Sequence, residues 1–223
     1  SAAIVSAGEP EVGRCEDVTA RVEQVWQPER LAAAKAAFTG AGDRFGAATW
    51  TLVEPRLAAW VDGWTRVRAD RCRALADGQL SEALHDRSVA CLERQVARLD
   101  GMLKVFVAAD AAAIEQAPIA VAGLPPPTAC ADADYLLSEV PLPEDPAARA
   151  AAARGGEALE QARASIDLGR YDAALARADE VATEARAVKY DPLLALAALA
   201  PGDALGRARG GARAAAAAPA ALE

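Results

Sequence analysis

The residues of this sequence best suited to covalent or metal chemistry are four cysteines, Cys15, Cys72, Cys91 and Cys130. No two of them have the Cys-x-x-Cys spacing of a structural zinc site, and the chain has a single histidine, so we predict no metal site. Two disulfides and four buried thiols remain as alternatives. Spacing alone favours neither of them.

Two cysteines flank a predicted helix–helix turn. If the turn at Gly78 is tight, Cys72 and Cys91 lie at different heights, roughly 10 Å apart at a rise of 1.5 Å per residue. A longer turn would let them meet. A bond between Cys15 and Cys130 would instead close a long loop.

The titratable residues form no catalytic set. His85 has no Ser or Cys partner at the spacing of a triad, and Asp86, Asp132 and Asp134 do not follow the pattern of a calcium-binding loop. The sequence also lacks a glycine-rich phosphate loop. We therefore predict that this chain is not an enzyme and binds no cofactor. A net charge of -8 and a pI near 4.9 argue against a nucleic-acid partner, because phosphate contacts need a basic face.

Composition favours an all-α fold. Of the 223 residues 61 are alanine and only 4% are aromatic, which suits close-packed helices better than a sandwich or barrel. Apolar residues recur at helical spacing over eight stretches. Their ranges are 11–26, 28–38, 49–76, 81–122, 131–137, 147–168, 171–188 and 192–207. Gly101 and Pro118 are candidate interruptions of the longest helix.

The segment 138–146 carries three prolines and three acidic residues and is the best candidate for a linker. It divides the chain into a helical bundle of sensor-like character over 1–137 and a second helical part over 147–223. We expect the end of the second part to be a frayed tail.

All four tryptophans lie in the first part, at Trp26, Trp50, Trp60 and Trp64. Trp60 and Trp64 are one helical turn apart, a spacing more typical of a core than of a stacking platform. A pocket for a small molecule among the four rings is the alternative hypothesis.

A turn motif stands out in the second part. The sequence Leu168-Gly169-Arg170-Tyr171-Asp172-Ala173-Ala174-Leu175 has the Gly-x-Tyr-x-x-Ala pattern typical of the turn within a tetratricopeptide repeat. Glycine ends the first helix, tyrosine packs on it, and Ala174 allows a close approach. Pro192 opens a further helix, which Pro201-Gly202 is expected to break. We predict an antiparallel helical bundle followed by a tetratricopeptide-like hairpin.

Short motifs follow one another in a fixed order from Cys15 to Gly206. They are Cys15, Val25-Trp26, Pro28, Arg30, Ala37-Phe38, Trp50, Val53-Glu54, Leu57, Trp64, Cys72, Gly78, Ser81-Glu82, Leu84, Asp86, Cys91-Leu92, Arg94, Leu99, Ala109-Asp110, Leu124-Pro125, Cys130-Ala131-Asp132, Gly169-Arg170-Tyr171, Ala174-Leu175, Ala185 and Pro192-Leu193-Leu194. In order and spacing they resemble the region that follows the kinase domain in membrane-bound, eukaryotic-like serine/threonine protein kinases of myxobacteria.

The resemblance implies a chain with a cytosolic kinase first, then a membrane helix, then this helical region on the extracytoplasmic, periplasmic side. This chain has no kinase motif, so the catalytic domain would lie outside it, and contact with the membrane would need a segment absent from it. Disulfides persist in such a compartment. With that location, the expected bonds are Cys72–Cys91 and Cys15–Cys130.

From this resemblance we expect the chain to be a non-catalytic sensor or protein-interaction region of such a kinase. A peptide or partner helix would dock in the groove beside the repeat, at Arg163, Arg170 and Tyr171. The alternatives are a structural spacer, a module that forms a homodimer, and a small-molecule sensor.

Overall fold

A computed structural model describes residues 15, 18–40, 45–141 and 143–217, with side chains up to 208. All regular structure in these ranges is helical, and no strand occurs in them. The elements are α1 (Ala20–Val25), α2 (Pro28–Gly40), α3 (Gly46–Ala76), α4 (Glu82–Val107), α5 (Ala111–Ala122), the 3-10 helix η2 (Pro127–Ala131), α6 (Ala133–Ser138), α7 (Pro146–Asp167), α8 (Tyr171–Ala187) and α9 (Asp191–Ala217). The prediction of an all-α packed bundle is confirmed.

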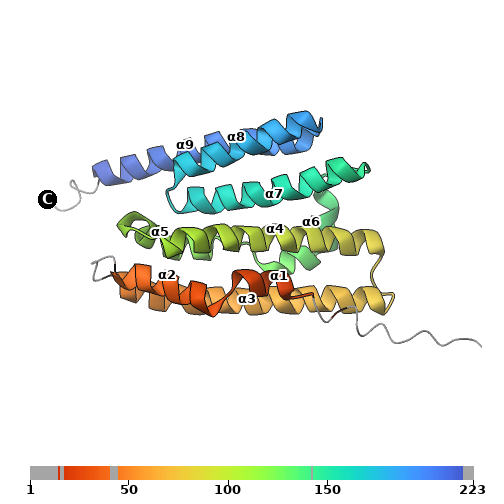
Figure 1. Cartoon of the computed structure of the whole chain (residues 1–223), viewed down its shortest axis with the longest axis horizontal. Helices are drawn as coiled ribbons and strands as arrows, with labels where there is room; N and C mark the ends of the chain where they lie inside the picture. The colour runs from red at the N-terminus through yellow and green to blue at the C-terminus, as the bar shows by residue number, and fades with distance from the viewer. Residues whose placement is uncertain (1–14, 16–17, 41–44, 142, 218–223) are drawn as a thin grey trace, which may run out of the picture.

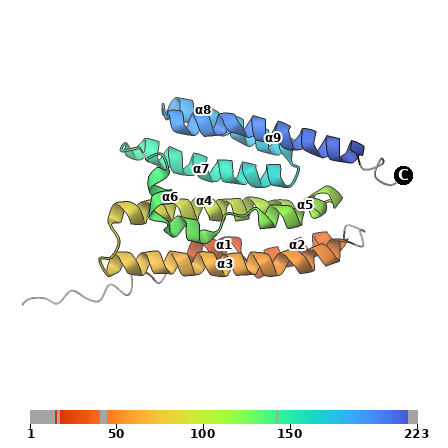
Figure 2. The same ribbon diagram turned by 180° about the vertical axis from the view of Figure 1, so that it is seen from behind.

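The helices stack in layers across the molecule (Figures 1 and 2). Helices α1, α2 and α3 form one edge, α4 and α5 lie on them, α7 lies on α4, and α8 and α9 form the other edge. Helix α4 is antiparallel to α3 but runs in the same direction as α7 (Figure 1). Helix α4 is therefore the central element, with the tryptophan-rich layer on one side and α7 on the other.

Most predicted helices are observed within a few residues of their expected bounds, with two exceptions. The predicted helix 81–122 is wrong, because it divides at 108–110 and not at Gly101 or Pro118. The division is set by Asp110, whose side chain accepts a hydrogen bond of 3.0 Å from the backbone N–H of Ala113 and so caps α5. The expected break at Pro201-Gly202 is also wrong, since α9 continues through it. Part of the predicted helix 11–26 lies outside the described residues.

Two groups of buried residues form the core. The first group surrounds α4 and contains an aromatic cluster in which Phe38 packs edge-on against Trp50 and Phe106, with ring centroids 5.2 and 5.1 Å apart. The second group lies among α7, α8 and α9, and nine of its thirteen members are alanines. Ala164 and Leu168 of α7 belong to the first group, so both groups meet on α7. The domain division at 138–146 stays a prediction.

A glycine sets the distance between α4 and α7. A Cβ atom at Gly101 would lie 2.9 Å from Cα and 3.1 Å from the carbonyl oxygen of Gln161. Any side chain at this position would therefore push the two helix backbones apart.

The turns on either side of α8 repeat one geometry. Gly169 and Lys189 both have positive φ, at 76° and 53°. The N–H that follows each of them donates back to the helix, from Arg170 to Ser165 O and from Tyr190 to Ala185 O, at 2.8 and 3.0 Å. This is the hydrogen-bond pattern of a helix end with a left-handed residue.

All four cysteines are in disulfides, but not in the expected pairs. The bonds are Cys15–Cys72 and Cys91–Cys130. The pairing Cys72–Cys91 is wrong because α3 and α4 are joined by a tight turn, with Gly78 at φ 69°, which leaves the two cysteines at different heights. The pairing Cys15–Cys130 is therefore wrong as well. Helix η2 packs on both α3 and α4 and brings Cys130 to Cys91.

We expect peptide mapping of the oxidised protein without reduction to recover these two linkages, 15–72 and 91–130. A peptide that joins Cys72 to Cys91 would contradict the tight α3–α4 turn. Reduction should lower the free energy of unfolding by several kcal/mol, about 2–5, because both bonds close loops of dozens of residues.

We expect Gly101→Ala to lower the free energy of unfolding by about 1–3 kcal/mol, because the added methyl group meets the backbone of α7. Denaturant unfolding measures the change. Gly206→Ala is the matched control, since no atom lies within 4 Å of a Cβ at that helical position. The control should be neutral or stabilising by up to about 1 kcal/mol. Equal effects of the two substitutions would contradict the close contact.

Candidate functional site: a cleft between α4, α7 and α9

A cleft of about 530 Å³ opens on one side of α7. Its floor comes from α4, and its walls come from α7, from the start of α9 and from the segment after α6. Two adjacent glycines of α7 make room for this arrangement. A Cβ atom at Gly155 would lie 2.5 Å from Leu193 Cδ2, and one at Gly156 would lie 3.2 Å from Arg94 Cδ.

The charged groups of the cleft are three arginines and two glutamates. Arg94 donates two hydrogen bonds to the carboxylate of Glu139, at 2.6 and 2.7 Å, and this ties α4 to the segment after α6. Arg98 lies 3.6 Å from a carboxylate oxygen of Glu160. Arg163 also pairs with Glu160. Arg98 is also hydrogen-bonded to Asp167, at 2.6 Å, so each of the three arginines has a carboxylate partner.

Apolar side chains make up much of the remaining wall. Leu159 and Leu193 are buried, whereas Leu196 is 44% exposed, and Tyr135 and Val140 are also exposed at the rim. Large apolar side chains exposed around a concave surface are typical of binding sites.

Besides Arg94, two side chains hold the segment after α6 in place. Arg87 donates hydrogen bonds to the carbonyl oxygens of Leu136 and Glu139, at 2.9 and 3.3 Å. The hydroxyl of Tyr190 donates to Pro141 O at 3.2 Å. Burial raises the pKa of Tyr190, which the positive charge of Arg94 opposes. Its hydroxyl thus remains a donor at neutral pH, and this wall of the cleft is fixed.

Only one of the three predicted partner-binding residues lies in the cleft. Arg163 lines it, with 42% of its side chain exposed. Arg170 instead pairs with Asp110 at 2.9 Å, beyond the end of α7, and Tyr171 packs against the alanine-rich core. The structure therefore does not bring the three together around the cleft.

The tryptophans belong to the core. Trp50, Trp60 and Trp64 are buried, and Trp26 packs on the same core while partly exposed. The indole N–H groups of Trp60 and Trp64 donate to Pro125 O and Leu92 O at 2.8 and 2.9 Å. No tryptophan lines this cleft or the smaller cavity described next.

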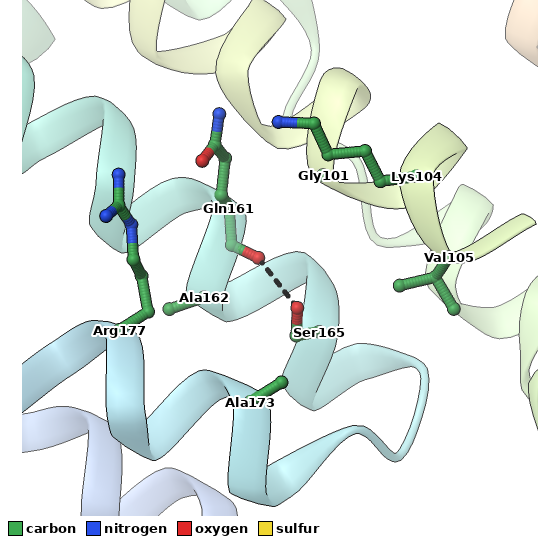
Figure 3. Close-up of a pocket in the computed structure, with 8 residues that line it drawn as sticks. All are labelled: Gly101, Lys104, Val105, Gln161, Ala162, Ser165, Ala173 and Arg177. Carbon is green, nitrogen blue, oxygen red and sulfur yellow. Dashed lines mark hydrogen bonds between the residues drawn. The ribbon is translucent and has the colours of Figure 1, made fainter.

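A smaller cavity of about 270 Å³ lies where α4, α7 and α8 meet (Figure 3). Small side chains such as Ala162 and Ala173 form part of its lining, and Lys104 and Gln161 stand at its edge. Oδ2 of Asp100 lies 2.8 Å from Nζ of Lys104 and accepts a hydrogen bond of 3.1 Å from Nε2 of Gln161. The cavity therefore presents polar groups that already have partners.

The same Asp100 joins three helices. It accepts hydrogen bonds from Arg30 of α2, at 2.7 Å, from Lys104 of α4 and from Gln161 of α7. Burial alone would raise the pKa of Asp100, but the hydrogen bonds from Lys104 and Arg30 outweigh burial and lower the pKa.

Two further kinds of site are not found. The described part of the chain contains no group of three or more His, Cys, Asp or Glu side chains that could hold a metal ion. None of the described helices is long and apolar enough to cross a membrane.

Sequence reasoning missed most of the cleft. Gln95 was overlooked although it is a polar residue within the apolar stripe of α4, between the buried Leu92 and Val96. Its Nε2 donates to Pro126 O at 3.3 Å, while its Oε1 has no hydrogen-bond partner. The paired glycines 155 and 156 were a second signal, since two glycines inside a helix often mark a close approach.

Comparisons of the chain with protein-family models, with curated proteins and with solved structures gave no match.

We expect Asp100→Asn to lower the free energy of unfolding at pH 7 by about 1–2 kcal/mol, because it removes a partly buried, charge-assisted hydrogen-bond acceptor. Because the pKa of Asp100 is lower in the folded state than in the unfolded state, its ionised carboxylate stabilises the fold above the unfolded-state pKa. This stabilisation is lost as the pH falls through the folded-state pKa. The difference between variant and wild type should therefore shrink below about pH 4. Asp62→Asn, at an exposed position, is the control. A difference that does not vary with pH would contradict this role of Asp100.

Proposed function

We propose that this chain is a non-catalytic sensor and protein-interaction region of a membrane-bound serine/threonine protein kinase whose catalytic domain lies outside it. The order of sequence motifs supports the link to a kinase. The cleft between α4, α7 and α9 is the observation that carries the binding role, because it combines apolar walls with arginine side chains, of which Arg163 is 42% exposed.

The two disulfides support an extracytoplasmic location. Both bonds join segments far apart in the sequence, at separations of 57 and 39 residues. Such bonds form and persist in oxidising compartments. The proposed region would therefore face a different compartment from the kinase domain that it serves.

The partner that fits the cleft is a peptide segment with apolar and acidic side chains. The apolar residues would contact Leu159, Leu193 and Leu196, and an acidic residue would pair with the partly exposed Arg163. Groove binding by a partner segment is a common use of helical folds.

The hairpin of α7 and α8 is a tetratricopeptide-like unit in this proposal. The repeated turn geometry at Gly169 and Lys189 supports this description, as does the burial of Ala174 at the helix contact. Helix α9 would open a second unit after the turn at Lys189.

A structural role in dimerisation is the second candidate. Helix α9 exposes Leu199 and Leu205 outside the cleft, and exposed apolar side chains on a terminal helix favour contact with another copy.

A displayed peptide library tests the binding role. We expect enriched peptides to combine apolar and acidic residues, and Leu196→Arg to weaken their binding by about tenfold or more, because it places a long cationic side chain in the wall of the cleft. Leu205→Arg is the matched control, since it makes the same change on α9 outside the cleft. Enriched peptides that bind both variants equally well would contradict this proposal.

A further inference from the structure

We propose that the binding surface of the cleft continues along α7 as far as Arg207, so that the partner segment carries two acidic residues, one for Arg163 and one for Arg207. This inference rests on the proposed binding role of the cleft and names the charge pattern of its partner.

Five side chains form a continuous chain of ion pairs on this side of α7. Arg163 pairs with Glu160, and Arg98 of α4 lies 3.6 Å from the same carboxylate. Arg98 also lies 2.6 Å from Oδ2 of Asp167, and Arg207 of α9 lies 2.9 Å from its Oδ1. The chain of pairs thus has arginines at both ends and in the middle. With three guanidinium groups and two carboxylates, its positive charges outnumber its negative ones.

Burial separates the two signs of charge. The side chains of Glu160 and Asp167 are only 13% and 7% exposed, whereas those of Arg163 and Arg207 are 42% and 54% exposed. In these pairs each end arginine contacts a carboxylate through one terminal nitrogen, and a guanidinium has further N–H donors. A partner therefore meets two guanidinium groups, with the carboxylates beneath them.

Asp167 holds Arg207 in this position. Asp167 is the last residue of α7, where the helix dipole disfavours a carboxylate, and burial disfavours it further. Arg98 and Arg207 offset both effects by their ion pairs with it. An arginine that is already held in place loses less side-chain entropy when it binds a ligand. The pair with Asp167 thus prepares Arg207 for binding.

Helices α7 and α9 run in the same direction past the cleft (Figure 1). A Cβ atom at Gly155 would meet Leu193 near the start of α9, and Asp167 pairs with Arg207 further along both helices. Arg207 therefore lies beyond the cleft in the direction in which both helices continue.

The helix geometry gives the spacing of the acidic residues. Leu196 and Arg207 are close to three full turns apart, so they share a face of α9 at a separation of roughly 16 Å along it. Leu159 and Arg163 are one turn apart on α7, or about 6 Å. An extended segment advances about 3.3 Å per residue. Its acidic residues should therefore follow the apolar residue held by the leucines after about two and about five positions.

An NMR titration with two capped hexapeptides tests the inference. The first is acetyl-Leu-Ser-Glu-Ser-Ser-Glu-amide, and the second has glutamine in place of the last glutamate. Both are too short to form a stable helix. We expect both to shift backbone amide signals of residues that line the cleft. The first should bind about threefold more tightly at low ionic strength, and added salt should reduce the difference.

Substitutions at Arg207 then test the second contact. Arg207→Gln removes the cation and should abolish the difference between the two peptides, whereas Arg207→Lys keeps the charge and should retain most of it. Arg154→Gln is the matched control, because Arg154 is an exposed arginine of α7 outside the cleft that also pairs with a glutamate. It should preserve the difference. The spectrum of each variant shows whether it is folded.

Three results would overturn the inference. If both peptides bind the wild-type protein equally, or if Arg207→Gln still distinguishes them, Arg207 does not contact a second acidic residue, whereas the cleft remains a binding site. If neither peptide shifts a cleft signal, the inference fails, and the peptide library decides separately whether the binding role stands.

Discussion

The structure depends on the contact between α4 and α7. The two helices run in the same direction and approach so closely at Gly101 that a single methyl group there would meet the backbone of Gln161. Arg98 joins them again through Glu160 and Asp167. On its opposite side α4 carries the aromatic core of the first layers, with Phe106 fully buried. One helix thus supports the tryptophan-rich layer and the alanine-rich layer at the same time.

This arrangement gives the cleft its position and its chemistry. The glycines 155 and 156 let Leu193 and the stem of Arg94 come close to α7. The cleft therefore collects side chains from both layers and from the segment between them. A segment bound there would contact α4, α7 and α9 together, so its binding free energy would depend on how these helices are placed. The proposed sensor role would use this dependence.

The fold class and most helix bounds could be predicted from the sequence because they follow local signals, such as the apolar spacing of α3 and the Gly169 turn. The break before α5 was missed because a single capping residue, Asp110, outweighed a continuous apolar pattern. The disulfide pairs and the cleft depend on which helices become neighbours. Cys130 reaches Cys91 only because η2 folds back across α3 and α4. Arg163, Tyr190 and Leu193 line one cleft only once α9 packs on α7. Contacts between segments that are far apart in the sequence produce no local residue pattern from which they could be predicted.

Native-state hydrogen exchange tests most directly whether α4 supports both layers as one unit. If it does, the slowest-exchanging amides of α4 and α7 should open with the same free energy, equal to that of global unfolding, and should respond equally to denaturant. Exchange of the α7, α8 and α9 amides through an opening that leaves the α4 amides protected would contradict this account. It would instead favour a separate second part that begins after residue 146.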